Sequence, residues 1–194
     1  PCGTYICNDV EIGLAGSLLL NFGIHVVAGT GAIVMGRDLK GRTARANGWH
    51  EDFSDEGSGH WLGLRTLSLF ARQADLREER SFLYEQMKER YGLHSDMDIV
   101  SFYQERFRGK RKEIAALQEV LLNAARAGDE SAARLYDAAA WELAQSVMGV
   151  ARQLDLVKEK TKVSYYGGIF RCGEWILTPF SDYLEQMGFV LKPP

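Results

Sequence analysis

Short apolar runs separated by glycine-rich turns dominate the first third of the chain. Two runs, Ile24–Val27 and Ala32–Gly36, are rich in β-branched and other apolar residues, and a third, Arg42–Asn47, alternates polar residues with alanines. Short runs of this composition, bounded by turn residues, are typical of β-strands. The sequence Asp-Leu-Lys-Gly at 38–41 has the turn chemistry needed before the third run. The pattern predicts a three-stranded antiparallel meander.

A helical periodicity begins near Phe53 and continues into the second half of the chain. From Ser131 to Leu156 apolar residues recur at spacings of three and four, which is typical of an amphipathic helix. A shorter helix is predicted over Ile114–Ala127, with Gly128 after its C-terminus and Asp129 as a candidate cap of the long helix. The stretch Leu76–Lys112 is helical in character but charged and weakly periodic, so we expect a peripheral elaboration.

The chain returns to the sheet near its C-terminal end. Lys162–Tyr166 is predicted to be a central strand that ends at Gly167-Gly168. Gly173–Met187 has a helical pattern, in which Pro179 is expected to mark an initial turn or a break. Strands that alternate with helices in this way indicate an α/β protein with a mixed sheet and a helical layer.

A strand-to-helix transition is also predicted near the N-terminus. Tyr5–Asn8 has the character of the end of a buried strand, and a helix is expected from Val10 to about Leu20. Asp9 lies between them, where its carboxylate can cap the helix. The carboxyl end of a strand is also where open α/β sheets place ligands, so Asp9 is a candidate to orient a nucleophilic hydroxyl and accept its proton. One carboxylate can serve both purposes.

Composition and charge narrow the class of protein. The 194 residues are 46% hydrophobic and 25% charged, and 23 Lys+Arg against 26 Asp+Glu give a net charge of -3, which offers no basic field for nucleic acid. The basic run Arg106–Lys112 is flanked by glutamates and is interpreted as a solvated helix junction. The longest apolar stretch, Ile24–Met35, is too short to span a bilayer. An odd number of cysteines (Cys2, Cys7 and Cys172) fits a reducing compartment. We therefore expect a cytoplasmic globular protein that binds neither nucleic acid nor membrane.

Two glycine-centred turns have the character of ligand-binding turns. In Gly29-Thr30-Gly31 the glycines let backbone N–H groups converge and the hydroxyl adds a donor, which suits a phosphate. Gly167-Gly168 follows a predicted strand, so a flat ring or a phosphate can lie against bare backbone there. A plain hairpin and a plain strand-to-helix turn are the alternatives.

The segment Gly48–Ser58 combines acids with aromatic residues. An exposed Trp49 beside acidic hydrogen-bonding groups suits a sugar, which has an apolar face and a rim of hydroxyls. The alternative for Ser54 or Asp55 is to cap the helix that follows. A metal site is disfavoured, since the candidate ligands match no His-Glu-x-x-His spacing and Gly57 interrupts them; they are His50, Asp55, Glu56 and His60.

The order of the motifs is more specific than any one of them. The series along the chain is Asn8-Asp9, Gly29-Thr30-Gly31, Gly48-Trp49, Asp55–Gly63, Ala127-Gly128-Asp129 and Tyr166–Phe170. It resembles the BadF/BadG/BcrA/BcrD-type ATPase family, and within it the N-acetylglucosamine kinase branch, most strongly from Val26 to Gly63. The resemblance implies an actin-like, ribonuclease-H-like α/β fold, in which two similar lobes close over ATP and Mg²⁺.

The resemblance also implies a role for each motif. Asp9 matches the catalytic aspartate that accepts the proton of the sugar hydroxyl. The second phosphate loop is matched by Gly29, Thr30 and Gly31, and the adenosine motif by Gly167 and Gly168. Sugar-pocket residues are matched by Gly48, Trp49, His50 and Asp55. The implied reaction transfers the γ-phosphoryl group of ATP to a hydroxyl of an amino sugar, with no protein metal site among these residues.

Departures from the family pattern bear on substrate and domain organisation. Ala32-Ile33 stands where the family usually has Ser-Asn, and His50 and Ser54 stand where it usually has Gly, which leaves the particular sugar open. The family's opening D-x-G-G-T phosphate loop is absent from these residues. We therefore expect residues 1–22 to be a remnant of an N-terminal lobe and its crossover helix, and residues 23–194 to be the C-terminal lobe. The partner would be the missing lobe; a homodimer is left open.

Two other functions compete with that of a kinase. The other branch of the family comprises ATPases that activate a partner reductase or dehydratase and hold an iron–sulfur cluster through cysteines. Cysteines at positions 2, 7 and 172 do not form the closely placed ligand set of that branch. A regulator that binds sugar or nucleotide without catalysis is the third hypothesis, and the presence of Asp9 argues against it.

Overall fold

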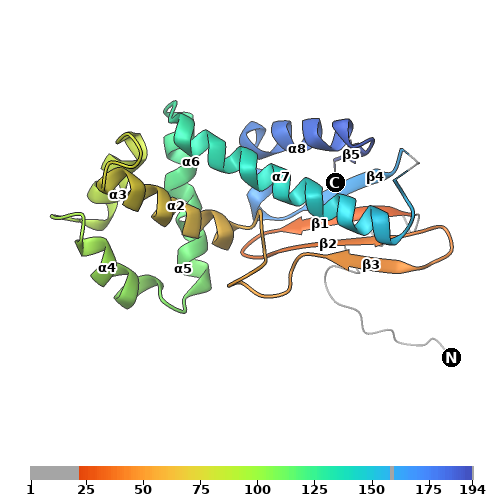
Figure 1. Ribbon diagram of the computed structural model, residues 1–194, viewed down its shortest axis with the longest axis horizontal. Coiled ribbons are helices and arrows are strands. Elements are labelled where there is room, and N and C mark those ends of the chain that lie inside the picture. Colours follow the sequence, from red (N-terminus) through yellow and green to blue (C-terminus); the bar gives the residue numbers. More distant parts are fainter. Residues whose placement is uncertain (1–21, 158–159, 194) are drawn as a thin grey trace.

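A mixed sheet lies at one end of the molecule, and helices extend from it toward the other end (Figure 1). The computed structural model describes residues 22–157 and 160–193. Within them the strand order is β3-β2-β1-β4-β5. The predicted strand at Tyr5–Asn8, the predicted helix from Val10 and Asp9 itself lie outside the described residues.

The predicted meander is confirmed. It consists of β1 (Gly23–Ala28), β2 (Ala32–Arg37) and β3 (Thr43–Ala46), each antiparallel to the next. The turn before β3 is held by Asp38, whose Oδ1 accepts hydrogen bonds from the backbone amides of Lys40 and Arg42 at 2.9 and 2.8 Å. This is the turn chemistry that the sequence predicts for residues 38–41.

The other side of the sheet is parallel. β4 (Lys162–Tyr166), which has the predicted bounds, runs parallel to β1, and β5 (Val190–Lys192) runs parallel to β4. β5 is not predictable from the sequence pattern, because three residues are too few to show a period. Since β1 and β4 are parallel, their carboxyl ends lie at the same edge of the sheet, where α/β proteins bind ligands.

The long predicted helix is α7 (Glu130–Gln153), which packs across β1, β2 and β3. The Asp129 side chain caps it by accepting a hydrogen bond from the backbone amide of Ala132 at 3.1 Å, as predicted. α8 (Glu174–Gln186) packs against α7 and continues through Pro179, so the expected break is wrong. The loss of one donor is outweighed by burial of α8 residues on both sides of the proline, namely Ile176, Phe180 and Leu184.

The remaining helices form an arm away from the sheet (Figure 1). They are α2 (Gly59–Ala74), α3 (Phe82–Tyr91), α4 (Asp98–Phe102) with a π-helical turn at Tyr103–Phe107, α5 (Arg111–Ala116) and α6 (Gln118–Arg126). The predicted helix over Ile114–Ala127 is therefore two helices that meet at the buried Leu117. The peripheral position of Leu76–Lys112 is confirmed for its larger part, because α3 and α4 lie at the far end from the sheet.

The start of α2 corrects one prediction. Ser58 is its N-cap, with a side chain that accepts a hydrogen bond from the backbone amide of Trp61 at 3.1 Å. Neither Ser54 nor Asp55 caps this helix, so that interpretation of the two residues is wrong. Across residues 22–157 and 160–193 there is no helix with the length and apolar character needed to cross a membrane.

Candidate active site

The turn between β1 and β2 is docked on the beginning of α2. The carbonyl oxygen of Gly29 accepts from the amide of Gly59 at 2.8 Å, and that of Thr30 accepts from the amide of His60 at 3.1 Å. The amide of Gly29 donates to the carbonyl of Gly31 at 2.8 Å. The turn is therefore held through its carbonyls, and the space beside the Gly29 Cα is open.

A second turn lies beside it at the end of β4. Gly167 has φ +124°, a conformation for which glycine is the suited residue. A Cβ at this position would overlap the carbonyl oxygen of Ala28, the last residue of β1. Gly168, which begins a 3₁₀ turn (Gly168–Cys172), has no atom near the position of a Cβ. The two glycines therefore differ: Gly167 allows two strand ends to meet, and Gly168 faces open space.

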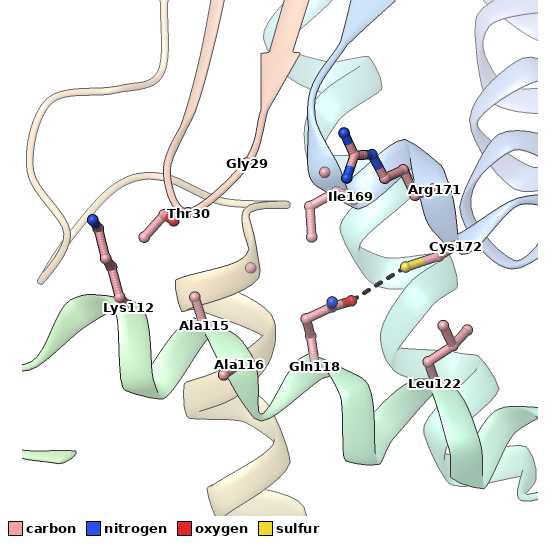
Figure 2. A pocket seen from close by; sticks show the side chains of 12 residues that line it. Gly29, Thr30, Lys112, Ala115, Ala116, Gln118, Leu122, Ile169, Arg171 and Cys172 are labelled. Atoms are coloured by element: carbon pink, nitrogen blue, oxygen red, sulfur yellow. Dashed lines mark hydrogen bonds between the residues drawn. The ribbon is translucent and has the colours of Figure 1, made fainter. Parts of the chain in front are cut away.

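Between these turns and the helices α5 and α6 lies a cavity of about 500 Å³, here called the glycine cavity. Figure 2 shows Lys112 and Thr30 on one side of it and Arg171 on the other. Among the described residues, its lining has two cations, Lys112 and Arg171, and no Asp or Glu. Because both charges are positive and bare glycine backbone faces them, the cavity suits an anionic ligand.

The floor of the glycine cavity is polar. The thiol of the buried Cys172 donates to Oε1 of Gln118 at 3.2 Å (Figure 2). Burial raises the pKa of the Cys172 thiol, which favours the protonated donor. The sequence analysis expects Cys172 to be a small buried residue, and its burial confirms this.

An aromatic hollow of about 280 Å³ adjoins the glycine cavity and shares Gly168 and Arg171 with it. Its other lining residues are Tyr165, Tyr166, Gly167 and Phe170. Tyr166 is 66% exposed, so much of its ring is available to a ligand. Aromatic walls beside a glycine suit a flat ring system, which complements the anionic preference of the glycine cavity.

On the other side of the β1–β2 turn lies a third cavity of about 360 Å³, here called the tryptophan cavity. Its lining residues are Gly31, Ala32, Ile33, Gly48, Trp49, His50, Glu51, Asp55 and Arg111. Gly29 and Gly31 therefore line different cavities, and the turn between them separates the two spaces.

The loop of the tryptophan cavity is organised by Asn47 and Ser54. Oδ1 of Asn47 accepts from the amide of Gly48 at 2.7 Å and from the Ser54 hydroxyl at 2.8 Å, while its Nδ2 donates to the carbonyl of Glu56 at 2.9 Å. Ser54, where the family pattern usually has glycine, therefore closes the loop by bonding to Asn47.

The aromatic residues of this loop are exposed. Trp49 is 70% exposed, and the guanidinium carbon of Arg45 lies 4.7 Å from a ring centroid of the indole. His50 stacks on Phe53 with 5.4 Å between ring centroids. The exposure expected for Trp49 is confirmed. Single apolar residues are common on surfaces, but here the indole lines a cavity that also holds a buried acid.

That acid is Asp55, which is 4% exposed and has φ +61°. Its Oδ1 accepts from the amide of Ala32 at 3.3 Å, and its Oδ2 forms an ion pair with Arg111. The amide links Asp55 to the start of β2, and the guanidinium links it to α5. Asp55 is thus held from two elements at the bottom of the tryptophan cavity.

The structure distributes the predicted site residues as follows. Gly29, Thr30 and Gly168 line the glycine cavity, Gly167 lines the aromatic hollow, and the tryptophan cavity receives Gly31, Gly48, Trp49, His50 and Asp55. Asp9 lies outside the described residues. Within the described ranges, His, Cys, Asp and Glu nowhere form a group of three or more that could hold a metal ion.

The lining residues that were not predicted include Arg111, Lys112, Gln118 and Arg171. The interpretation of residues 106–112 as a solvated helix junction agrees with the exposure of Lys112. It did not anticipate that α5 carries Arg111 to the tryptophan cavity and Lys112 to the glycine cavity. The interruption of the basic run by Gly109 is the one signal that could have suggested a change of surroundings.

With this geometry established, the chain can be compared with known proteins. The model of the BadF/BadG/BcrA/BcrD ATPase family matches residues 5–189. The chain belongs to this family. The family resemblance and the fold class predicted from the sequence are therefore confirmed.

Two curated relatives of this BadF/BadG/BcrA/BcrD ATPase chain are named kinases. It is 34% identical over 180 residues to an N-acetylmuramic acid/N-acetylglucosamine kinase of Clostridium acetobutylicum. This match covers 93% of the chain and 58% of the relative. It is also 28% identical over 165 residues to an N-acetyl-D-glucosamine kinase of Dictyostelium discoideum. That match covers 84% of the chain and 52% of the relative. The chain thus spans little more than half the length of these relatives.

Solved structures agree with the fold. A Chromobacterium violaceum protein assigned as an N-acetylglucosamine kinase matches with a TM-score of 0.71 and 27% identity, over 93% of this chain and 58% of that one. A ROK family glucokinase from Streptomyces griseus matches with a TM-score of 0.53 and 14% identity, over 96% of this chain and 61% of that one. The second likeness concerns the fold alone.

Proposed function

We propose that this chain supplies the C-terminal lobe, residues 23–194, of an ATP-dependent amino-sugar kinase, with residues 1–22 leading in from an N-terminal lobe. One observation carries the proposal. The Gly29-Thr30-Gly31 turn separates a cavity whose described lining has two cations and no acid from a cavity with an exposed indole and a buried acid. Two substrates bound in these spaces would meet at the turn, which is the arrangement that phosphoryl transfer needs.

The glycine cavity is the proposed nucleotide-phosphate site. Thr30 and Lys112 stand on the side toward the turn, where they would donate to terminal phosphate oxygens, and Arg171 stands on the opposite side (Figure 2). The open space at Gly29 and Gly168 lets phosphate or ribose approach the backbone closely. The aromatic hollow at Gly167 and Gly168 would take the adenine ring, which agrees with the adenosine motif that the family resemblance implies.

The tryptophan cavity is the proposed sugar site. The Trp49 indole would lie against the apolar face of the sugar ring, and Asp55 would accept hydrogen bonds from ring hydroxyls. Gly48 and His50 line the same space, as the resemblance implies. Ala32 and Ile33 offer no side-chain hydrogen bond where the family usually has Ser-Asn, so sugar recognition here depends more on Asp55 and the backbone.

Asp9 is the proposed acceptor of the proton that the attacking sugar hydroxyl loses. A carboxylate in this position orients the hydroxyl and removes its proton, a contribution of roughly 10²- to 10⁴-fold. Mg²⁺ would neutralise charge on the nucleotide phosphates. It is typically held by one or two carboxylates and by phosphate oxygens, so it does not need a three-ligand group among the described residues.

The activator ATPase is the weaker candidate. Both curated relatives above are kinases that act on N-acetylated amino sugars. Cys172, the cysteine within the described residues, is buried and bonded to Gln118. An iron–sulfur cluster needs several cysteine thiolates close together, whereas Cys172 is a protonated hydrogen-bond donor, so the kinase is favoured.

The test is a split of Michaelis constants in the complete protein. N-acetylglucosamine should stimulate ADP formation. We expect Lys112→Met to raise the KM for ATP about tenfold and to change the sugar KM less than about threefold, because it removes a charged donor to phosphate. Trp49→Ala should raise the sugar KM and change the KM for ATP much less.

Arg108→Met is the matched control. Arg108 belongs to the same basic run, but its side chain is exposed and donates to Gln104, so neither KM should change. ATP hydrolysis that ignores amino sugars and accompanies bound iron would instead establish the activator function. A sugar KM that rises with Lys112→Met would show that the two cavities are assigned incorrectly.

A further inference from the structure

Arg111 has an unusual position for a member of a basic surface run. It is the first residue of α5, and α5 packs against α2. Its side chain is 37% exposed, pairs with Asp55 and places Nη1 3.5 Å from a carboxylate oxygen of Glu51. Its Nε is buried and has no hydrogen-bond partner in the described part of the chain. Arg111 therefore lies between two acids of the loop that forms the tryptophan cavity.

The β1–β2 turn is shaped to receive this guanidinium. A Cβ on Gly31 would overlap Nη2 of Arg111 and would stand 2.8 Å from Oδ2 of Asp55. Glycine at position 31 is what leaves room for the ion pair. A side chain at position 31 would therefore displace the ion pair, whereas Gly29, with nothing near its Cβ position, faces open space.

Within the described residues, each carboxylate oxygen of Asp55 has one hydrogen-bond partner. Oδ1 bonds to the amide of Ala32 and Oδ2 to Arg111. An ionised carboxylate has about four acceptor positions, so about two stay available on the cavity side. A buried carboxylate also needs a compensating cation, and Arg111 is the cation that contacts it.

We propose that Arg111 is a positioning residue of the sugar site, which holds Asp55 in the single orientation that accepts hydrogen bonds from sugar hydroxyls. This rests on the proposed function, since it assigns Asp55 to the sugar. Arg111 does not itself bind the substrate. Its guanidinium is shared between Asp55 and Glu51, so the described lining of the cavity holds no unshared arginine for a negatively charged sugar.

The adjacent Lys112 provides a contrast within one helix. Arg111 lines the tryptophan cavity and Lys112 the glycine cavity, although they are consecutive. A general disturbance of α5 would affect both cavities, whereas loss of the Arg111 side chain alone should affect the sugar site. The two effects can therefore be separated by kinetics.

The experiment measures kcat, both KM values and the melting temperature of the complete protein carrying Arg111→Met. We expect the KM for N-acetylglucosamine to rise roughly tenfold, because removing Arg111 leaves the buried Asp55 carboxylate without its cation. The KM for ATP should stay within about twofold. Arg111→Lys should recover part of the loss, because lysine supplies the charge without the planar donor pair. Lys112→Met serves as the comparison, because it should raise the KM for ATP and leave the sugar KM nearly unchanged.

A double variant tests whether Arg111 acts through Asp55. In an Asp55→Asn background, Arg111→Met should cause little further loss in kcat/KM for the sugar, since coupled residues are not additive. Additive losses would overturn the proposal, as would an unchanged sugar KM or an equal rise in both KM values. If Arg111→Met lowered kcat/KM for N-acetylmuramic acid alone, which carries a carboxylate, the proposal would also be overturned, and Arg111 would be a direct ligand of that carboxylate. If the wild type forms no ADP in response to amino sugars, the proposed function itself fails, and this inference fails with it.

Discussion

His25 is a polar residue in the middle of β1, with 2% of its surface exposed. Its Nδ1 lies 2.8 Å from the Ser164 hydroxyl on the parallel strand β4, so the hydrogen bond links the two strands that carry the glycine turns. Burial lowers the pKa of His25 from 6.5 to about 4. At neutral pH the imidazole is therefore uncharged, which suits a residue inside the sheet.

This shift predicts a pH dependence of stability. The unfolded chain binds the His25 proton below about pH 6.5 and the folded protein only below about pH 4, so folding stability falls as the pH drops from 6.5 toward 4. Because His25 is uncharged at neutral pH, the free energy of unfolding is up to about 3 kcal/mol higher there than below pH 4. Burial also lowers the pKa of His60, so His60 also makes folding stability fall as the pH drops.

The measurement is chemical unfolding of wild type and His25→Gln at several pH values between 4 and 7. Because His60 is present in both proteins, the difference between the two curves reports His25. The free energy of unfolding should fall less steeply in the variant as the pH drops. Identical slopes would contradict the prediction.

Among the secondary-structure elements, close contacts made by glycines decide where the cavities lie. Gly167 lets the end of β4 touch the end of β1, and Gly63 lets α2 lie against the backbone of α5, because a Cβ there would overlap the carbonyl oxygen of Ile114. The first contact places the aromatic hollow beside the β1–β2 turn. The second brings Arg111 and Lys112 to the two cavities.

Gly167→Ala and Gly168→Ala should therefore have different effects. An alanine at 167 would be strained at φ +124° and would overlap Ala28. We expect a loss of about 1–3 kcal/mol or more, which lowers the melting temperature by several degrees. An alanine at 168 meets no neighbour, so the melting temperature should stay within about 2 °C, since the site tolerates a methyl group.

Thermal unfolding and the KM for ATP, measured on both variants, check this. Gly168→Ala should raise the KM for ATP, because its methyl group points into space proposed for the nucleotide. Equal melting temperatures for the two variants would show that the Gly167 contact does not stabilise the fold.

For the whole molecule, the important feature is that the cavities gather at one edge of the sheet, around the carboxyl ends of β1 and β4. All the phosphate-binding groups proposed here come from one lobe. The chain spans 58% of the length of the Clostridium acetobutylicum relative, and the family's D-x-G-G-T phosphate loop is absent from it. The proposed second lobe would supply the remaining contacts to the triphosphate.

We accordingly expect residues 1–194 alone to bind ATP weakly and to lack sugar-dependent turnover. Half of the phosphate cradle would be absent, so the reacting groups would not be aligned. ADP release by residues 1–194 and by the complete protein, with N-acetylglucosamine present, tests this. Turnover of residues 1–194 at about 1 to 100 per second, a rate typical of kinases, would refute the two-lobe proposal.

The sequence by itself determined those features that depend on local pattern. The meander over residues 23–46 and the strand Lys162–Tyr166 were predictable as short runs bounded by turn residues. The helix capped by Asp129 was predictable because its buried face leaves a helical period in the sequence. The order of the glycine and acid motifs was sufficient to indicate the family.

Tertiary structure alone decided which side chains meet. Asp55 and Arg111 are 56 positions apart, and no spacing relates them, since their ion pair depends on how α2 and α5 pack. Pro179 stays inside α8 because packing against α7 outweighs one lost donor. Gly167 and Gly168 are the same residue type, and they differ in backbone conformation and in what lies beside them. Local periodicity specifies which face of an element is buried, whereas contacts between distant segments depend on the packing of the whole sheet and its helices.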